Sequence, residues 1–318
     1  MREPGRSVAA DQCGAEQAQI APGDRGCQKS RRTERSGRVQ RARPRIGVGA
    51  QVAQPEGVVH RRGLPRAGAE PPALMRDRFF VEGVHAAGEH VALAPDDARK
   101  VATVLRKRTG DRVQVVDSGG VAFAATLEVD GRSVRATLDA LLDRDAVETT
   151  IEVTIAQAVP KGQKMDLVVE KATELGAYAI VPVRSARVIG YDTSPAKVER
   201  WRRIAKSAAQ QSGRTRVPPV ADVVDWDALL ATFAGYDRVY VPWELADPAP
   251  LRAVFEREVP AACSVLVVIG PEGGFAADEV ARARAAGGAP ISLGRRILRT
   301  ETAALVVLAA ILYARDEL

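Results

Sequence analysis

The sequence predicts an α/β domain with a parallel sheet, preceded by a small β domain. From about residue 146 onward, short strands that are apolar throughout alternate with helical segments. Such strands indicate a parallel sheet covered by helices on both faces. Between residues 75 and 145, shorter alternating strands are separated by turn signals, which is typical of a small β domain. We therefore expect two domains, at residues 75–145 and 146–318.

Residues 1–74 differ in composition from the rest of the chain. The formal net charge is +6, and these residues alone hold fourteen Lys and Arg against seven Asp and Glu. Residues 29–49 show no apolar stripe at a helical or strand period, so burial could not offset the entropy of ordering them. We expect a disordered leader, or upstream sequence translated ahead of a true start at Met75. A basic RNA-binding arm is the alternative.

The small β domain is expected to close into a barrel. A helix is predicted over residues 95–111, with Asp96 or Asp97 as its N-cap and Gly110 as its left-handed C-cap. The pair Asp130-Gly131 stands between two alternating runs and predicts a hairpin. Strands are expected at residues 78–81, 90–93, 112–116, 121–129 and 132–138.

The α/β domain is expected to begin with a strand and to end with a buried helix. Strands are predicted at residues 151–159, 179–183, 238–242, 265–270 and 291–294, and helices at 164–176, 194–211, 249–258, 277–286 and from 300. Gly176 is a typical C-cap, and Ser194-Pro195 is a typical helix start. The last helix has thirteen consecutive residues that are nearly all apolar, fewer than the roughly 20 needed to span a membrane.

Three loops that follow predicted strands have an unusual composition: PWEL at residues 242–245, GPEGGF at 270–275 and GRRILRTET at 294–302. In parallel α/β sheets, ligands bind outside the carboxyl ends of the strands. The glycines of GPEGGF leave the backbone bare enough to touch a ligand. GxxxxGK[ST] and GxGxxG are absent, which disfavours a nucleoside triphosphate or dinucleotide. For GPEGG alone, a tight strand–helix turn is the alternative.

Cysteine and histidine contents exclude several kinds of site. The chain has three of each, without a CxxC pair. A zinc site, a disulfide framework and a histidine-based catalytic triad are therefore not expected. The chain also lacks the apolar region of a secretory signal, so we expect a cytoplasmic protein without a metal or a membrane partner.

Four motifs, taken in order, resemble the RsmE family: KGQKMDLVVEKATELG, RWRRIAKSAAQQSGRTRVPPV, IGPEGGF and LGRRILRTETAAL. Members of this family methylate N3 of a uridine in bacterial 16S ribosomal RNA, and they belong to the SPOUT methyltransferases. The resemblance covers about residues 76–315. It implies a PUA-like RNA-binding barrel, a SPOUT domain with a trefoil knot, S-adenosylmethionine as cofactor, the small ribosomal subunit as partner, and a homodimer.

The resemblance also implies functional residues. Cofactor contacts fall on Leu245, Gly270, Glu272, Gly273, Gly274, Leu293, Gly294, Ile297 and Leu298. Uracil N3 normally carries a proton, so a base must remove it or cations must stabilise the uracil anion. Glu301 or Glu272 is the candidate base, and Arg299 or Arg214 the candidate stabiliser. Each arginine could instead be a phosphate clamp or half of an ion pair, and Glu301 a helix N-terminal carboxylate.

Basic clusters in both domains are candidates for holding RNA. They comprise Arg99, Lys100, Arg106, Lys107 and Arg108 in the small domain, and Arg200, Arg202, Arg203, Lys206, Arg214 and Arg216 in the α/β domain. A solvated helix face is the alternative for each run. The sequence departs from the usual family pattern at Ser207 and Gln210, where glutamates are more common. Two further functions stay open: another SPOUT RNA methyltransferase, acting on a ribose 2′-oxygen or another base, or a non-catalytic ribosome assembly factor.

Overall fold

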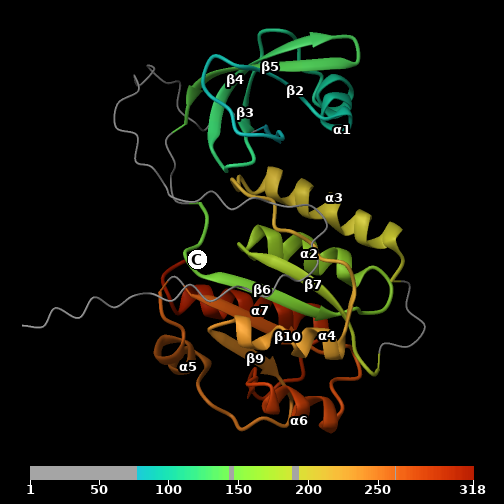
Figure 1. The fold of residues 1–318 in the computed structure, drawn as a ribbon, viewed down its shortest axis with the longest axis vertical. Helices are drawn as coiled ribbons and strands as arrows, with labels where there is room; N and C mark the ends of the chain where they lie inside the picture. The colour runs from blue at the N-terminus through green and yellow to red at the C-terminus, as the bar shows by residue number, and fades with distance from the viewer. Residues whose placement is uncertain (1–76, 143–146, 188–192, 262) are drawn as a thin grey trace, which may run out of the picture. The chain divides into compact units, whose positions relative to one another are not determined.

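The computed structural model of the protein describes residues 77–142, 147–187, 193–261 and 263–318. All of the described residues belong to one compact unit. The expectations for the leader, and for a start at Met75, therefore lie outside the described residues. Figure 1 follows the described chain by colour from residue 77 to its end.

The small domain contains a five-stranded sheet with the strand order β1-β3-β4-β5-β2. Its strands are β1 (Arg78–Phe80), β2 (His90–Ala92), β3 (Arg112–Val116), β4 (Ala122–Asp130) and β5 (Ser133–Leu141). β1 runs parallel to β3, and the other neighbours are antiparallel. The predicted hairpin is confirmed, because Asp130 pairs with Ser133 and Gly131 adopts a positive φ of 58°. β1 and β2 are the two edge strands of this sheet and do not pair with each other, so the strand pairing does not show the predicted closure into a barrel.

The helix of the small domain differs from its prediction. α1 (Pro95–Arg99) is followed by a π-helical stretch (Lys100–Val104), and the N-cap is Ala94 rather than Asp96 or Asp97. Pro95 explains the shift, because proline is favoured at the first helical position. Both aspartates then lie in the first turn, where the helix dipole favours negative charge.

The predicted C-cap of this helix is also wrong. The helical stretch ends at Leu105, and Arg106 takes a positive φ of 52°. Gly110 does have the expected left-handed conformation, with φ 95°. It stands in the loop before β3, however, where its N–H donates to the carbonyl of Leu127 at 2.9 Å.

The second domain contains a six-stranded sheet whose pairs are all parallel, as predicted, with the order β11-β9-β10-β6-β7-β8. The strands are β6 (Glu152–Ala158), β7 (Ala179–Arg184), β8 (Val224–Asp225), β9 (Arg238–Pro242), β10 (Ser264–Ile269) and β11 (Ala289–Ile291). β8 was not predicted, and β11 lies earlier than the predicted strand 291–294, with which it shares only Ile291.

Helices cover both faces of this sheet. α2 (Lys164–Glu174), α3 (Pro195–Gln211), α5 (Leu251–Glu258) and α7 (Thr300–Tyr313) contribute to one core. α4 (Trp226–Leu230), the 3-10 turn Phe233–Gly235 and α6 (Ala277–Ala285) contribute to the other. Successive residues of a strand point to opposite faces, so Val265 and Val267 of β10 join the first core, while Leu266 and Val268 join the second.

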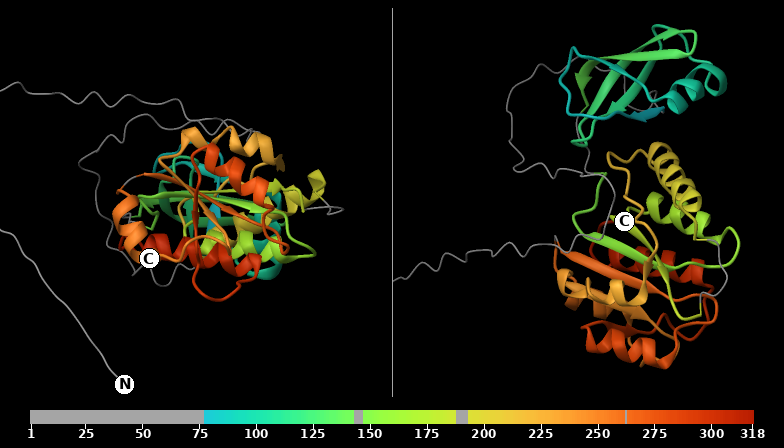
Figure 2. Two further views of the ribbon diagram at one scale, coloured as in Figure 1. Left: turned by 90° about the horizontal axis from the view of Figure 1, so that it is seen from below. Right: turned by 45° about the vertical axis from the view of Figure 1, so that its right-hand side comes forward.

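α7 runs along β6 and β10, as the views in Figures 1 and 2 show. Its inward residues Ala304, Val307, Leu308 and Ile311 are fully buried, so the expectation of a buried last helix is confirmed for this face, whereas Val306 and Tyr313 are exposed. Within the residues described, no helix is long and apolar enough to cross a membrane.

Candidate functional site

The carboxyl ends of four neighbouring strands meet at one edge of the parallel sheet. β11, β9, β10 and β6 are adjacent in the strand order. The loops PWEL, GPEGGF and GRRILRTET leave β9, β10 and β11 at that edge, and the segment from Val159 to Gln163 leaves β6. Loops that are distant in sequence are therefore brought together, as the strand pattern predicts.

A chain of buried hydrogen bonds ties two of these loops to β6. Gln157, which is fully buried in β6, donates through Nε2 to Thr300 Oγ1 at 2.8 Å. Thr300, at the start of α7, donates in turn to the carbonyl of Gly270 at 2.5 Å. Gln157 Oε1 is buried without a hydrogen-bond partner among the described atoms. Sequence reasoning singled out neither Gln157 nor Thr300.

The PWEL loop joins the same assembly. The N–H of Trp243 donates to the carbonyl of Ile291 in β11 at 2.9 Å. Glu244 lies against Gly274, because a Cβ added to that glycine would stand 3.0 Å from Glu244 Oε1. The guanidinium of Arg187 donates to the carbonyl of Gly273. All three loops selected from the sequence therefore contribute to one region of the structure.

Backbone conformation and close packing explain two of the glycines in GPEGGF. Gly274 has a φ of 66°, a left-handed conformation that costs other residues free energy. A Cβ on Gly270 would meet the ring of Phe275 at 3.3 Å. Because Gly270 and Gly274 have no Cβ, neighbouring side chains approach the backbone of this loop closely. A backbone without side chains at these positions fits a ligand that is held by main-chain atoms.

Apolar side chains of the loops stand open at the surface. Leu245 is 72% exposed and Ile297 is 83% exposed, whereas Leu293 and Leu298 are half-buried. Exposed large aliphatic side chains beside bare backbone are the lining expected of a site for an organic ligand with a few polar groups.

A charged cluster lies beside the GPEGGF loop. Glu272 accepts hydrogen bonds from Lys164 Nζ at 2.7 Å and from the backbone N–H of Lys161 at 3.0 Å. Burial raises the pKa of Glu272, but these hydrogen bonds lower it by more, so the pKa falls below its ordinary value. Glu272 is therefore a weak base that is already engaged. The charges of Glu301 and Arg299 also act on Lys164.

Glu301 and Arg299 are differently placed. Glu301 lies in the first turn of α7, and its Oε2 is buried without a hydrogen-bond partner among the described atoms. A buried polar atom without a partner is uncommon and calls for an explanation. Arg299 precedes α7 directly and is exposed, with no ion pair to any described residue.

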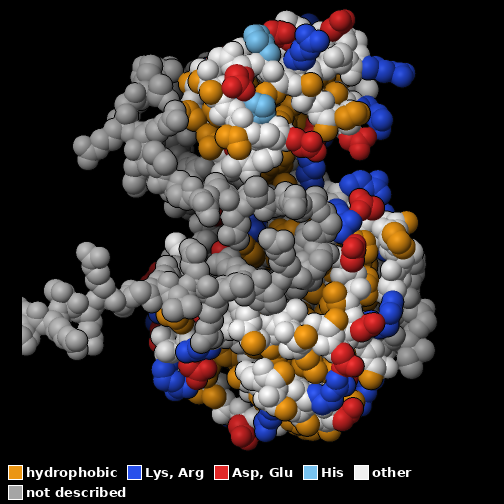
Figure 3. All heavy atoms as spheres, in the orientation of Figure 1, with side chains coloured by type: hydrophobic (Ala, Val, Ile, Leu, Met, Phe, Trp, Pro, Cys, Tyr) orange, Lys and Arg blue, Asp and Glu red, His pale blue; other side chains and the backbone are white. Residues whose placement is uncertain are grey.

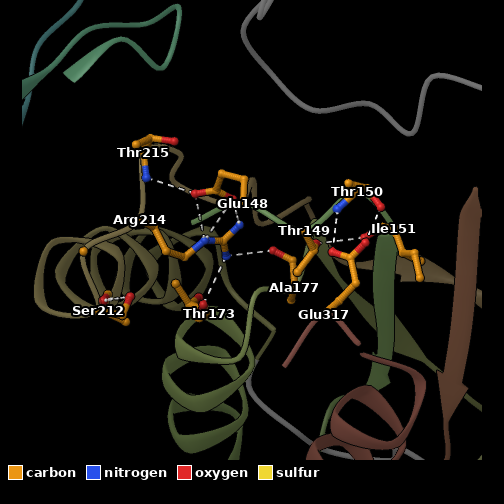
Figure 4. A network of polar contacts seen from close by, with 12 residues as sticks. Glu148, Thr149, Thr150, Ile151, Thr173, Ala177, Ser212, Arg214, Thr215 and Glu317 are labelled. Atoms are coloured by element: carbon orange, nitrogen blue, oxygen red, sulfur yellow. Dashed lines mark hydrogen bonds and ion pairs between the residues drawn. The ribbon is translucent and has the colours of Figure 1, made fainter. Parts of the chain in front are cut away.

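Arg214 lies in a buried polar network, which Figure 4 shows. It is 3% exposed, and its Nη2 stands 2.6 Å from Glu148 Oε2. Its Nη1 donates to the carbonyls of Thr173 and Ala177 at 3.1 and 2.9 Å. Since its donors are engaged inside the domain, this placement favours the ion-pair interpretation of Arg214 over the catalytic one.

The predicted RNA-contacting residues are partly engaged within the chain. Lys107 pairs with Asp77 at 3.0 Å, Lys206 with Asp97 at 2.6 Å, and the guanidinium of Arg216 lies 3.7 Å from the centroid of the Tyr178 ring. The cations Arg106, Arg108 and Arg203 are exposed. On the face seen in Figure 3, basic and acidic side chains are interspersed, so this face does not form one large basic surface.

Comparison with known proteins decides the family. Residues 147–312 match the family of RNA methyltransferase domains, which accounts for most of the α/β domain. The chain is 34% identical over 248 residues to the ribosomal RNA small subunit methyltransferase E of Bacillus subtilis, covering 75% of this chain and 97% of that protein. The chain belongs to the ribosomal RNA small subunit methyltransferase E family. A member from Mycobacterium bovis is 35% identical over 247 residues, covering 73% of this chain and 90% of its own.

A solved structure of a family member resembles this fold. The methyltransferase E of Neisseria gonorrhoeae bound to S-adenosyl methionine has a TM-score of 0.66 and 30% identity, covering 74% of this chain and 97% of that one. In the present chain, the loops expected to contact a cofactor are those that follow β9, β10 and β11 at one edge of the sheet.

Proposed function

We propose that this protein transfers the methyl group of S-adenosylmethionine to N3 of a uridine in the 16S ribosomal RNA of the small subunit. The observation that carries the proposal is the convergence of PWEL, GPEGGF and GRRILRTET beside Glu301, whose Oε2 has no hydrogen-bond partner among the described atoms. The names of the family members, and the cofactor bound to one of them, support the same reaction.

The cofactor site is proposed to use mainly backbone groups. Its residues are Leu245, Gly270, Glu272, Gly273, Gly274, Leu293, Gly294, Ile297 and Leu298. The left-handed backbone of Gly274 and the exposed side chains of Leu245 and Ile297 support a site where main-chain polar groups and apolar side chains hold an adenosine together. When bound, S-adenosylmethionine supplies a methyl group already activated on a sulfonium, so the protein needs chiefly to align the acceptor nitrogen and exclude water.

Glu301 is proposed as the base that takes the N3 proton, because its Oε2 has no competing partner among the described atoms. Glu272 has the lowered pKa of a carboxylate bound by Lys164 and is the weaker candidate. Arg299 is exposed and without an ion pair to the described residues, so it can approach a uracil carbonyl oxygen and stabilise the anion. Arg214 is proposed to stabilise the fold through its ion pair with Glu148 and to take no part in the reaction.

The substrate is tested by methyl transfer to purified small subunits that lack the modification. We expect mass spectrometry of the digested nucleosides to show N3-methyluridine after incubation with the protein and S-adenosylmethionine. A 2′-O-methylated nucleoside or a different methylated base would support another SPOUT methyltransferase. Absence of any methyl transfer, together with RNA binding, would support the assembly-factor alternative.

The finer fold and the assembly are part of the same proposal. The small domain is proposed to be a PUA-like RNA-binding module, the α/β domain a knotted SPOUT domain, and the assembly a homodimer in the cytoplasm, where ribosomal RNA is modified. The exposed side chains of Val306 and Tyr313 on α7 support the dimer. Light scattering at working concentration should give the mass of two chains; the mass of one chain would contradict it.

Gly274→Ala is expected to weaken cofactor binding about tenfold. Alanine at φ 66° costs about 1–2 kcal/mol, and its Cβ would displace the side chain of Glu244. Thermal denaturation measures the effect: a hundredfold excess of cofactor over Kd stabilises the wild type by about 2.7 kcal/mol, and the variant should gain less at the same concentration.

Gly287→Ala is the matched control. Gly287 has a φ of 97°, but a Cβ there meets no atom within 4 Å, and it lies at the end of α6. This variant should lose stability while keeping the cofactor affinity of the wild type. Equal cofactor affinities in all three proteins would contradict a role for the bare backbone of Gly274.

A further inference from the structure

A basic cavity that is widely open to solvent lies beside the start of α2 and α3, apart from the three cofactor loops. Its volume is about 320 Å³, and it is lined by Gln163, Ser194, Ala196, Lys197, Arg200 and Arg203. Gln163 precedes α2 and Ser194 is the N-cap of α3. The two helices pack against each other, as Figure 1 shows.

The cations of this cavity lie along one side of α3. Lys197, Arg200 and Arg203 follow one another at a spacing of three residues, which places them on neighbouring turns. Among the described residues, Lys197 has no ion pair, and Arg203 makes only a 3.4 Å hydrogen bond to the carbonyl of Glu199. Two positive charges at this cavity are therefore not neutralised by described carboxylates.

Arg202, on another side of the same helix, provides the contrast. It pairs with Glu199 and with Asp222, and it donates to the carbonyl of Val220 at 3.0 Å. Its charge serves the packing of α3 against the rest of the domain. Lys197 and Arg203 differ from Arg202, because neither has a carboxylate neighbour among the described residues.

Arg200 is held in place by Asp166 of α2. Asp166 accepts from Arg200 at 3.0 Å (Nε) and 2.7 Å (Nη2), and its other oxygen accepts from the indole N–H of Trp201 at 3.1 Å. Trp201 is buried, so Asp166 is anchored to the core. A guanidinium fixed in this way loses little conformational entropy when it binds an anion.

The lining of the cavity indicates the chemistry of its ligand. Three cations, a hydroxyl and an amide converge on it, and none of the described lining residues is aromatic. Arginine and lysine with hydroxyl and amide groups are typical partners of phosphate oxygens. The described lining residues thus offer partners for phosphate oxygens and none for base stacking, which favours the backbone of a nucleic acid over its bases.

The cavity adjoins the proposed methyl-transfer site. Gln163 is followed directly by Lys164, whose Nζ stands 2.7 Å from Glu272 in the GPEGGF loop. Consecutive Cα atoms are about 3.8 Å apart, so a strand of RNA that places a base beside this loop passes close to the cavity.

We propose that this cavity binds a phosphodiester of the RNA strand next to the target uridine and thereby positions that uridine. The inference rests on the proposed function and adds a binding subsite to it. Lys197 and Arg203 supply the uncompensated charge, Arg200 the fixed guanidinium, and Asp166 positions Arg200. Lys197 did not stand out in the sequence, because a single lysine in a polar helix carries no distinguishing pattern.

The test uses the double variant Lys197→Gln/Arg203→Gln, with Arg284→Gln as the control. Arg284 is exposed on α6 and has no ion pair to a described residue. Binding is measured by fluorescence anisotropy of a labelled single-stranded RNA that contains the target uridine, at several salt concentrations. Methyl transfer to small subunits lacking the modification is measured in parallel.

We expect the double variant to bind this RNA about tenfold more weakly near 0.15 M salt, and the slope of log K against log salt to become shallower by about 1.4, or 0.7 for each lost phosphate contact. KM for the subunit should rise with little change in kcat, and stabilisation by S-adenosylmethionine should stay unchanged. The control should match the wild type in each measurement.

If the double variant has the RNA affinity and the salt slope of the wild type, the inference is wrong, whatever its rate of methylation. Failure of the wild type to methylate would overturn the proposed function instead, while the binding data would still decide the subsite. If inorganic phosphate at constant ionic strength stabilises the wild type but not the double variant, and RNA binding is equal in both, the cavity is a free-anion site and the phosphodiester assignment is wrong.

Discussion

Glu301→Gln is expected to lower kcat for methyl transfer by about 10²–10³-fold, while KM for the small subunit and the affinity for S-adenosylmethionine stay near their wild-type values. General base catalysis contributes about 10²–10⁴-fold to a rate, and an amide cannot take up the N3 proton. The substitution keeps the shape of the side chain. Glu301 Oε2 is buried without a described partner, so no hydrogen bond that holds the fold together is expected to be lost there.

The rival base supplies the control for this prediction. Glu272→Gln should lower kcat by about tenfold or less, because Glu272 has a lowered pKa and is already bound by Lys164. Single-turnover rates separate the chemical step from product release for both variants. A larger loss of rate in Glu272→Gln than in Glu301→Gln would assign the proton transfer to Glu272.

Much of the site could be predicted because it follows from sheet geometry. Apolar strands separated by helices predict a parallel sheet, and a parallel sheet places the loops after its strands at one edge. The three selected loops accordingly contact one another through Gly270 and Gly274, and Trp243 ties the PWEL loop to the end of β11. The identity of the reaction came from the resemblance of the motifs to a family, since spacing alone left a tight turn as an equal explanation for GPEGG.

Other parts of the site could not be predicted, because their meaning depends on partners far away in sequence. Gln157 sits in an otherwise apolar strand, and its partner Thr300 is 143 residues further along the chain. Asp97 looked like a helix cap, yet it accepts hydrogen bonds from Lys206 and Gln210. The pairing of Arg214 with Glu148 could not be predicted either. A basic residue after a helix is compatible with an RNA contact until its burial is known.

Arg214→Met is expected to destabilise the protein by about 3 kcal/mol, the lower end of the range for breaking a buried ion pair, because Glu148 is partly exposed. Methionine has a comparable length but no donors. The substitution therefore leaves the Glu148 carboxylate without its cation and removes the Arg214 donor from the carbonyls of Thr173 and Ala177. For a domain of this size, the melting temperature should fall by roughly 6–12 °C.

Arg216→Met is the matched control, since Arg216 lies two residues further along and stacks on Tyr178 without a buried ion pair. Its loss should cost about 1 kcal/mol or less. Denaturant unfolding of the wild type, Arg214→Met, Glu148→Gln and the double variant measures the coupling between the pair, and Arg216→Met is unfolded in parallel. If Arg214→Met keeps wild-type stability but loses methylation in the folded protein, the catalytic interpretation of Arg214 regains its place. Loss of stability with residual methylation per folded molecule would instead establish that Arg214 acts by joining α2 to the segment that enters the α/β domain.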